Sequence, residues 1–417
     1  MQFDVLKILF YLAIILIATK LIGILARSSG LPQVAGMVIA GLLIGPAIFG
    51  QIDLLPFNGI INPTAEEMDV LKTFSQIGVV LILFSSGLET DTKELKKSGF
   101  AATMIALAGV IIPIILGTVI TALFMGGLDS LKEHDKLMNA LFAGCILSAT
   151  SVGITVETLR ELGKLKSKVG TTVLSAAIID DVIGILALSL LTSLNGDGDV
   201  VITLLKALAF FAVGIGLGFP IKWLFVWICK RYPHARRTSI FALAVCFIYS
   251  YVAETYFGIA AITGAFLAGI MLSGLKDTDF VDQKVLTNGY MIFTPIFFAF
   301  IGISADFSSF KPTDLLFGLA FVAVGIAGKI LGCGAVAKCC RYDLRDSTTI
   351  GFGMIARGEV ALAVYSTGHH LIAKAADGTV VGINPLIATI MLIVISSILC
   401  PIFLKLIFGK SSESKAV

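Results

Sequence analysis

The sequence predicts an all-α membrane protein of about thirteen transmembrane helices in a single unit. Of its 417 residues, 57% are hydrophobic and only 14% are charged, whereas soluble domains carry about 25% charged residues. Apolar stretches long enough to span a bilayer as helices, which takes about 20 residues, recur from one end of the chain to the other. Only short polar connections separate them, so no soluble regulatory domain is expected.

Each predicted helix is an apolar stretch bounded by polar, glycine or proline residues. The first is expected to be retained rather than cleaved as a signal peptide, because Lys7 is the only basic residue near the start and no clean small-residue cleavage site follows. The predicted spans are 5–26, 32–50, 70–90, 99–126, 137–158, 168–194, 200–228, 238–255, 258–275, 286–304, 313–337, 347–369 and 384–408.

Basic residues concentrate in every second connection between the predicted helices. Clusters of Lys and Arg occur at 93–97, 160–168, 230–237 and 338–345. Because cytoplasmic connections carry the excess of positive charge in membrane proteins, we predict that the N-terminus lies outside and the C-terminus in the cytoplasm. The net charge of +3 is spread over these connections and gives no reason to expect a nucleic-acid partner.

Two short motifs occur twice, seven predicted helices apart. The segment AGMVIAG at 35–41 resembles TGAFLAG at 263–269, and GLETD at 87–91 resembles GISAD at 302–306. An odd separation places the two copies of each motif in opposite orientations across the membrane. We therefore predict inverted repeats, which is the plan of many secondary transporters.

Two adjacent carboxylates, Asp180 and Asp181, lie near the middle of the predicted span 168–194. A charge at a helix centre costs roughly 2.5–3.5 kcal/mol, so its presence calls for a reason. Successive helical residues point about 100° apart, so one carboxylate is expected to face a cavity and the other a neighbouring helix. A carboxylate that holds either a cation or a proton supports exchange of one for the other.

Hydroxyl groups and a glycine cluster within the predicted span 137–158, where residues 147–155 read LSATSVGIT. Such side chains compete for backbone hydrogen bonds, and glycine permits a break, which we expect near 150–153. A break offers oxygens to a cation, including those of Thr150 and Ser151. A continuous helix that uses small residues for close packing is the alternative.

Three further charges fall within the predicted spans 313–337 and 347–369. Lys329 lies too deep to reach water easily and is expected to pair with an aspartate of the span 168–194. Arg357 and Glu359 are flanked by glycines that favour a second break, near 354–358. Arg357 is expected to offset the partial negative ends of the half-helices or to pair with a carboxylate such as Glu359, so that both residues stabilise charge in the core.

In combination, these residues carry a family resemblance. Asp180-Asp181, Thr150-Ser151, Lys329, RGEV at 357–360 and LFSSGLE at 83–89 resemble the monovalent cation:proton antiporter-2 family, and more closely its bacterial NapA-type sodium/proton antiporters. The resemblance covers essentially the whole chain. It implies an NhaA/NapA-like fold with inverted repeats and two broken, crossing helices, in a bacterial cell membrane. It also implies a transporter rather than an enzyme, with no bound cofactor.

The resemblance also implies roles for individual residues. By this likeness Asp181 binds the transported cation, with further oxygens from Thr150 and Ser151. By the same likeness Asp180 forms a salt bridge with Lys329. In the mechanism that we expect, Lys329 releases a second proton when Asp180 changes state, which would make the exchange electrogenic.

An assembly is implied as well. The resemblance indicates a homodimer in the lipid bilayer, in which a core domain moves against a dimerisation domain in an elevator-like cycle. The core domain would comprise about 99–194 and 313–408, and the dimerisation domain about 5–90 and 238–304. A linker helix at about 200–228 would join them.

The predicted function is therefore exchange of Na⁺ or another monovalent cation for H⁺. Potassium/proton antiport within the same family is the first alternative, although potassium-efflux relatives usually have glutamine in place of Asp180 and carry a nucleotide-binding tail. An organic-anion symporter of related fold is the second alternative. A channel would need a filter of repeated carbonyls and an ATP-driven pump a Walker-type loop, and the sequence contains neither.

Overall fold

In the part of the chain that it describes, the structure, a computed structural model, consists of helices joined by short connections and contains no strand. That part comprises residues 5–29, 31–46, 60–90, 92–194, 200–232, 236–275, 277–305, 312–368, 371–372 and 382–413. The α-helices are α1 (Val5–Ser28), α2 (Gln33–Ile44), α4 (Ala65–Glu89), α5 (Thr92–Phe124), α6 (His134–Ser148), α7 (Val152–Glu161), α8 (Lys168–Leu194), α9 (Val200–Arg231), α10 (Arg236–Phe257), α11 (Ala261–Leu272), α12 (Thr278–Asn288), α13 (Thr294–Ile303), α14 (Pro312–Cys339), α15 (Leu344–Gly353), α16 (Glu359–Gly368) and α17 (Leu386–Glu413). A 3₁₀-helix, η1, spans Leu128–Lys132, and a π-helical segment, η2, spans Gly289–Phe293. The predicted all-α class is confirmed.

The helices fit a membrane by length and composition. Ten stretches of the described chain are long and apolar enough to cross a bilayer, two of them made of consecutive helices, α6 with α7 and α12 with α13. The helices α2 and α11 are apolar but have only 12 residues each. The pair α15 and α16 occupies the remaining predicted span, 347–369. Every predicted segment thus contains a helix, while thirteen full crossings remain a prediction.

Three helices, α4, α5 and α12, begin well before the apolar segments that predicted them. The helix α4 starts at Ala65 because Thr64 and Glu67 form a capping box, in which each side chain accepts from the other residue's backbone N–H. The span predicted at 286–304 begins at Thr278 and passes through η2 before it ends at Ile303. Hydropathy locates the middle of a span, whereas at α4 a capping box decides where the helix begins.

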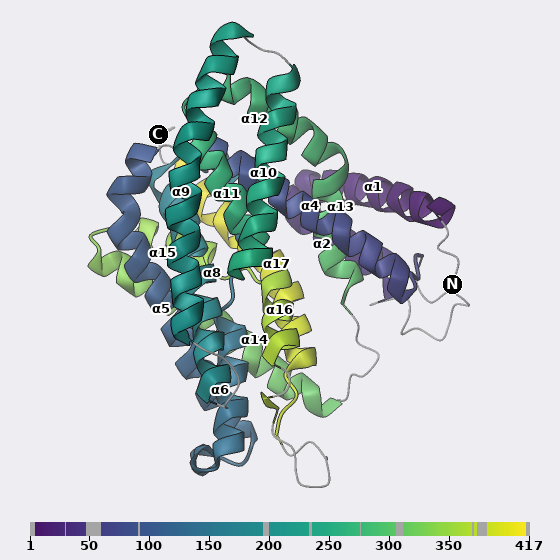
Figure 1. Ribbon diagram of the computed structural model, residues 1–417. Helices are drawn as coiled ribbons and strands as arrows, with labels where there is room; N and C mark the ends of the chain where they lie inside the picture. Colours follow the sequence, from purple (N-terminus) through teal and green to yellow (C-terminus); the bar gives the residue numbers. More distant parts are fainter. Residues whose placement is uncertain are drawn as a thin grey trace.

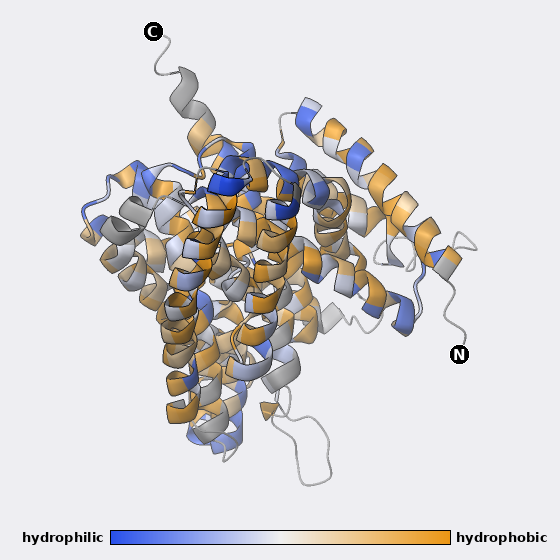
Figure 2. Cartoon of the chain, turned by 45° about the horizontal axis from the view of Figure 1, so that its top comes forward, coloured by the Kyte–Doolittle hydropathy of each residue, from blue (hydrophilic) through white to orange (hydrophobic). Residues whose placement is uncertain are grey.

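Large apolar side chains cover the outer surface of the molecule. Leu9 and Phe10 on α1 and Trp223 and Trp227 on α9 are each more than half exposed. Figure 2 shows hydrophobic residues along the lengths of the helices and hydrophilic ones toward their ends. Exposed apolar surface of this extent suits hydrocarbon and not water.

The helices pack in two groups, which we call the core group and the scaffold group. The core group contains α5, α6, α7, α8, α14, α15, α16 and α17, and the scaffold group contains α1, α2, α4, α10, α11, α12 and α13. Figure 1 shows α1 on one side of the molecule and α5 and α6 on the other. The helix α9 contacts α8 of the core group and α10 and α11 of the scaffold group. Movement of one group against the other remains a prediction.

Glycines of the repeated motifs meet where the scaffold helices cross most closely. A Cβ atom on Gly269 of α11 would lie 2.8 Å from the Cα of Gly87 on α4. A Cβ atom on Gly302 of α13 would lie 2.7 Å from the carbonyl carbon of Gly41 on α2. In the repeated motifs Gly41 corresponds to Gly269 and Gly87 to Gly302. The same close crossing is therefore built twice, which supports the predicted repeats.

These crossings predict that Gly269→Ala destabilises the protein. The new methyl group would meet the backbone of α4 at Phe84 and Gly87, which cannot move aside as a side chain can. We expect a loss of about 1–3 kcal/mol, measured as a lower midpoint of thermal unfolding in detergent. The matched control is Gly216→Ala on α9, where nothing lies within 4 Å of the added Cβ. Similar midpoints for the two variants would contradict the close crossing.

Candidate functional site

Two helices of the core group are interrupted near their middles. The helix α6 ends at Ser148 and α7 begins at Val152, with Ser151 in extended conformation between them. The helix α15 ends at Gly353 and α16 begins at Glu359. Both predicted breaks are confirmed, and the alternative of a continuous helix through the hydroxyl cluster is wrong.

The two breaks cross each other in direct contact. The backbone N–H of Ser151 donates a hydrogen bond to the carbonyl of Ala356 at 2.8 Å. The hydroxyl of Thr155, in the first turn of α7, donates to the carbonyl of Gly353 at 2.7 Å. Backbone groups that the breaks release are thus satisfied across the crossing, as burial requires.

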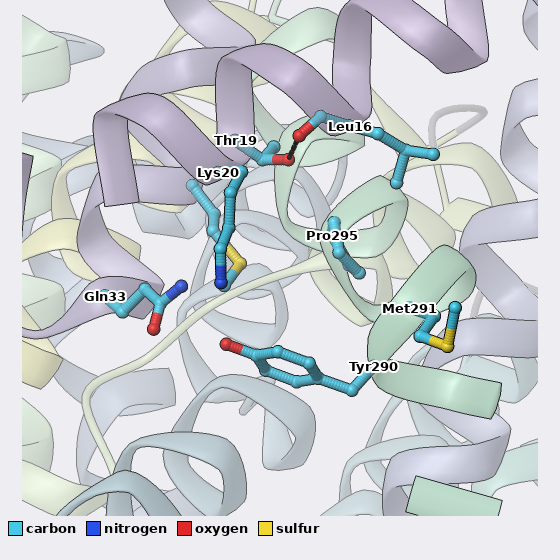
Figure 3. Close-up of a pocket in the computed structure, with 8 residues that line it drawn as sticks. Leu16, Thr19, Lys20, Gln33, Tyr290, Met291 and Pro295 are labelled. Atoms are coloured by element: carbon cyan, nitrogen blue, oxygen red, sulfur yellow. Dashed lines mark hydrogen bonds between the residues drawn. The ribbon is translucent and has the colours of Figure 1, made fainter. Parts of the chain in front are cut away.

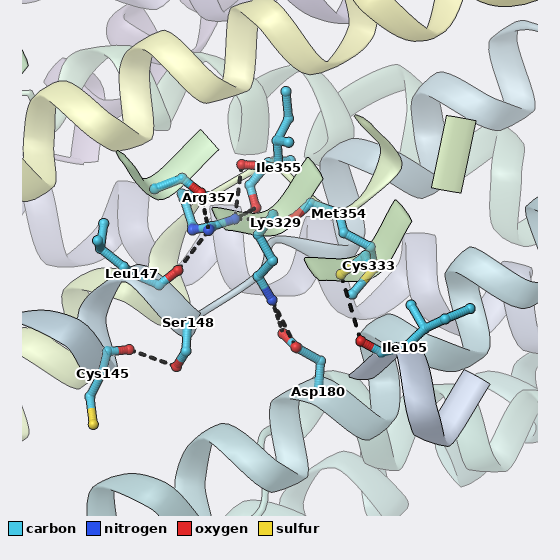
Figure 4. Close-up of polar contacts among 12 residues, drawn as sticks. Ile105, Cys145, Leu147, Ser148, Asp180, Lys329, Cys333, Met354, Ile355 and Arg357 are labelled. Carbon is cyan, nitrogen blue, oxygen red and sulfur yellow. Dashed lines mark hydrogen bonds and ion pairs between the residues drawn. The ribbon is translucent and has the colours of Figure 1, made fainter. Parts of the chain in front are cut away.

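Arg357 lies fully buried at the crossing and donates to carbonyls of both broken helices. Its guanidinium bonds to the carbonyl of Leu147 at 2.6 Å, of Ile355 at 2.9 Å and of Met354 at 3.1 Å (Figure 4). These oxygens lie at the C-terminal ends of α6 and α15, where a helix carries partial negative charge. Of the two roles predicted for Arg357, these contacts match the first, which is to offset the ends of the half-helices.

The helix α17 fixes the second break from its other side. The backbone N–H of Arg357 donates to the hydroxyl of Ser396 at 2.9 Å, and the hydroxyl of Ser397 donates to the carbonyl of Arg357 at 2.9 Å. Both serines are buried. Two side chains of α17 therefore hold the backbone of the second break.

A buried ion pair joins α8 to α14. The ammonium nitrogen of Lys329 lies 2.7 Å from Oδ1 and 3.0 Å from Oδ2 of Asp180, and both side chains are 0% exposed. Gly109 on α5 leaves room for the pair, because a Cβ there would lie 3.1 Å from the carboxylate and 3.2 Å from the ammonium. The predicted contact is present, and its role in transport remains a prediction.

Asp181 follows directly on α8 and is 4% exposed. The helix α8 packs against α6, α7, α15 and α16, so this carboxylate lies on a helix that touches all four half-helices. Thr150 and Ser151 are fully buried at the first break. Their hydroxyl oxygens accept and donate no hydrogen bond within the described part of the chain. The crossing therefore holds oxygen atoms that can serve a cation.

The remaining predicted site residue is Glu359. Its backbone begins α16, but its side chain lies outside the part that the structure describes. Among the described residues, no group of three or more His, Cys, Asp or Glu could hold a metal ion.

Sequence reasoning missed the residues that shape the site without carrying charge. Gly109 is one of 42 glycines, and nothing in its neighbourhood in the sequence marks it. Ser396 and Ser397 lie in the last apolar segment, where two serines commonly indicate close packing. An adjacent hydroxyl pair opposite a predicted break is the signal that could have found them.

A second polar cluster joins the end of α7 to the scaffold group. The guanidinium of Arg160 lies 2.8 Å from Glu157 on its own helix and 3.5 Å from Glu89 on α4. It also donates to the hydroxyl of Ser85 on α4 at 3.1 Å, and Ser85 bonds in turn to Asp282 on α12. Only 15% of the Arg160 side chain is exposed. This cluster is a polar tie between the two groups of helices.

The next residue of α7 makes another tie. The carboxylate of Glu161 accepts hydrogen bonds from the backbone N–H of Gln33 at 2.8 and 2.9 Å. Gln33 is the first residue of α2, whose N-cap residue, Pro32, offers no capping side chain. A carboxylate at a helix N-terminus is favourable for both hydrogen bonding and the helix dipole. One residue of the core group thus caps a helix of the scaffold group.

Comparison with known proteins decides the family. Residues 12–410 match the family described as sodium/hydrogen exchanger, transmembrane. The chain belongs to this family. It is an integral, multi-pass membrane protein, and its predicted recognition as a cation:proton antiporter is confirmed, whereas the NapA-type subgroup remains a prediction.

Members of the sodium/hydrogen exchanger family from bacteria resemble the chain over nearly its whole length. It is 35% identical to the Na⁺/H⁺-K⁺ antiporter GerN of Bacillus cereus, with 97% of each chain covered. It is 38% identical to the probable Na⁺/H⁺ antiporter GerT of the same organism, with 88% of this chain and 92% of GerT covered. The fold resembles that of the sodium proton antiporter MjNhaP1 of Methanocaldococcus jannaschii, with a TM-score of 0.69 at 17% identity over 97% and 98% of the two chains.

The buried pair predicts strongly non-additive stability changes. Lys329→Ala leaves the Asp180 carboxylate buried without its partner, and Asp180→Asn does the same to the Lys329 ammonium. Each change should therefore lower the free energy of unfolding by about 3–5 kcal/mol. The double variant leaves neither charge stranded and should lose less than the sum. Thermal or denaturant unfolding of the four proteins in detergent measures the difference.

The control for this cycle combines Lys329→Ala with Asp69→Asn, because Asp69 is exposed on α4 and makes no ion pair with the lysine. The losses of unfolding free energy from those two substitutions should add. Additive losses for Lys329 and Asp180 as well would show that the pair contributes no coupling.

Proposed function

We propose that this protein is a secondary antiporter that exchanges Na⁺, or another monovalent cation, for H⁺. The observation that carries the proposal is a buried carboxylate, Asp181, on the helix that packs against both breaks, where the hydroxyls of Thr150 and Ser151 hold unsatisfied oxygens. Carboxylate and hydroxyl oxygens are ligands for hard cations. The names of GerN and GerT support the same activity.

Competition for one carboxylate supplies the coupling. The cation reaches Asp181 and displaces its proton, and the proton displaces the cation on the other side. Either occupant neutralises the carboxylate, so the loaded site avoids the penalty of carrying a charge through the apolar barrier. The empty, charged site incurs that penalty and stays where it is. Exchange follows without ATP.

Asp180 and Lys329 have a separate task in this proposal. Asp180 is engaged by Lys329 at 2.7 Å, and for this reason we assign the transported ion to its neighbour, Asp181. Full burial penalises the charged form of a lysine once its partner is lost. A change at Asp181 that weakens the pair would therefore release a proton from Lys329, which makes the exchange electrogenic.

Elevator-like movement of the core group against the scaffold group is part of the proposal. All the proposed ion ligands belong to the core group, whereas few core helices touch the scaffold group. The ties at Arg160 and Glu161 join the two groups and would have to open in each cycle. The exposed apolar faces of the scaffold group support a homodimer within the bilayer.

Location and selectivity complete the proposal. The distribution of basic residues supports an N-terminus outside the cell and a cytoplasmic C-terminus, and the bacterial relatives support the bacterial cell membrane and a role in pH homeostasis. Potassium/proton exchange is the second candidate, because the name of GerN includes K⁺. Proton flux in proteoliposomes driven by Na⁺, K⁺ or Li⁺ at clamped membrane potential decides between them.

Asp181→Asn should abolish exchange. The amide binds a cation weakly and carries no titrating proton, so cation-driven proton flux should fall to the level of protein-free liposomes. Asp69→Asn, the same chemical change at an exposed position of α4, should leave flux unchanged. Unfolding midpoints show whether the Asp181 variant is folded, and exchange by a folded variant would overturn the proposed site.

The ties at the end of α7 give a test of the movement itself. Arg160→Gln removes a mostly buried cation that contacts Glu89 of α4. Lys166→Gln also removes a cation near Glu89, at 4.0 Å, but the Lys166 side chain is 68% exposed. We expect the first change to loosen the closed contact, seen as faster hydrogen exchange at the start of α2 and an altered turnover rate. The second change should do neither, because exposed pairs are worth about 0–1 kcal/mol. Identical behaviour of both variants would contradict the opening of these ties during transport.

A further inference from the structure

A groove on the membrane-facing side of the scaffold group holds three polar groups among apolar surroundings. It encloses about 250 Å³ between α1, α2 and η2, and its lining includes Lys20, Gln33 and Tyr290. Figure 3 shows the ammonium of Lys20, the amide of Gln33 and the hydroxyl of Tyr290 turned toward one another. All three can donate hydrogen bonds. The ion site does not involve this groove.

Lys20 is the unusual member of this set. It lies within an apolar span, about two turns before the end of α1. Within the described residues it makes no ion pair. The nearby acids on α7 are engaged elsewhere, Glu157 by Arg160 and Glu161 by the start of α2. A lysine at this depth extends its ammonium toward the headgroup region, and the groove receives it there.

Several features of the fold shape the groove. Tyr290 is carried by η2, and π-helical segments occur frequently at functional sites. Its hydroxyl is turned toward the side chain of Gln33 (Figure 3). Gly23 lets that side chain pass, because a Cβ there would lie 2.9 Å from the Cγ of Gln33. The backbone of Gln33 is fixed by Glu161.

We infer that this groove binds an anionic phospholipid, with its phosphate held by Lys20, Tyr290 and Gln33. Basic pockets between transmembrane helices on the cytoplasmic side are suited to such headgroups. A free phosphate ion would accept hydrogen bonds from these donors, but it would leave the apolar surface beside the groove uncovered. Ile17, Leu21 and Met291 are each more than half exposed beside the groove and offer a surface for acyl chains. Only a ligand with a charged head and apolar tails matches both features.

The membrane orientation proposed above places the groove at the inner leaflet. Only the choice of leaflet depends on that orientation; lipid binding itself does not. Binding is therefore measured in detergent micelles, where sidedness and transport play no part. Failure of the antiport assays would leave the lipid result standing, and failure of lipid binding would leave antiport untouched.

The test compares lipid binding by the intact protein and its Lys20→Gln variant. Native mass spectrometry and thermal unfolding are recorded with added phosphatidylglycerol, with phosphatidylcholine and with inorganic phosphate. We expect discrete binding and a raised unfolding midpoint with phosphatidylglycerol alone, and about tenfold weaker binding by Lys20→Gln. Lys206→Gln removes another exposed lysine within a span, on α9, and should bind like the unaltered protein.

Two further variants test the geometry of the groove. Tyr290→Phe removes a single hydroxyl, and Gly23→Ala pushes on the side chain of Gln33, so both should weaken phosphatidylglycerol binding while leaving Lys20 in place. The inference fails if Lys20→Gln and Lys206→Gln behave alike. It also fails if phosphatidylcholine or inorganic phosphate gives the same response. Loss of the dimer in Lys20→Gln, with unchanged lipid binding per chain, would assign the groove to a second copy of the protein instead.

Discussion

Unsatisfied backbone groups at two helix breaks are the constraint on which the core group depends. Within a bilayer no water replaces a lost hydrogen bond, so a break is tolerated only where protein groups accept and donate in its place. Arg357 supplies several donors to the carbonyls of both helices, and the N–H of Ser151 reaches Ala356. The serines of α17 complete the set. The breaks are therefore rigid features, which a binding site for a small ion requires.

The placement of the buried charges follows from the same requirement that each donor and acceptor find a partner. Arg357 is fully buried without a carboxylate partner in the described chain, because carbonyl dipoles surround its guanidinium. Lys329 cannot be satisfied in that way and takes Asp180. Two adjacent aspartates thus acquire different environments on one helix. In the proposed mechanism this division leaves Asp181 to alternate between cation and proton, while Asp180 holds Lys329 until that lysine releases its own proton.

Much of this arrangement could be predicted from the sequence, since membrane burial makes each charge informative. Asp180 and Lys329 stand out because ionised side chains are costly in hydrocarbon, and LSATSVGIT predicts a break because hydroxyls compete for backbone bonds. Gly109 and Ser396 could not be found, because they act by leaving space or by meeting a distant backbone group. The start of α4 was missed because a capping box, not hydropathy, determines it.

The contrast between the two groups of helices bears on how a moving ion site stays intact. In the scaffold group, paired glycines bring backbones into contact at two equivalent crossings, so these helices are fixed to each other by shape. Between the groups, by contrast, the contacts at the end of α7 are polar and partly exposed, as with Arg160 and Glu161. Polar contacts near water can be exchanged for hydration at small net cost, whereas backbone packing cannot. Of the contacts between the groups, those at the end of α7 are therefore the ones that can open at small cost, and the proposed elevator movement would have to open them.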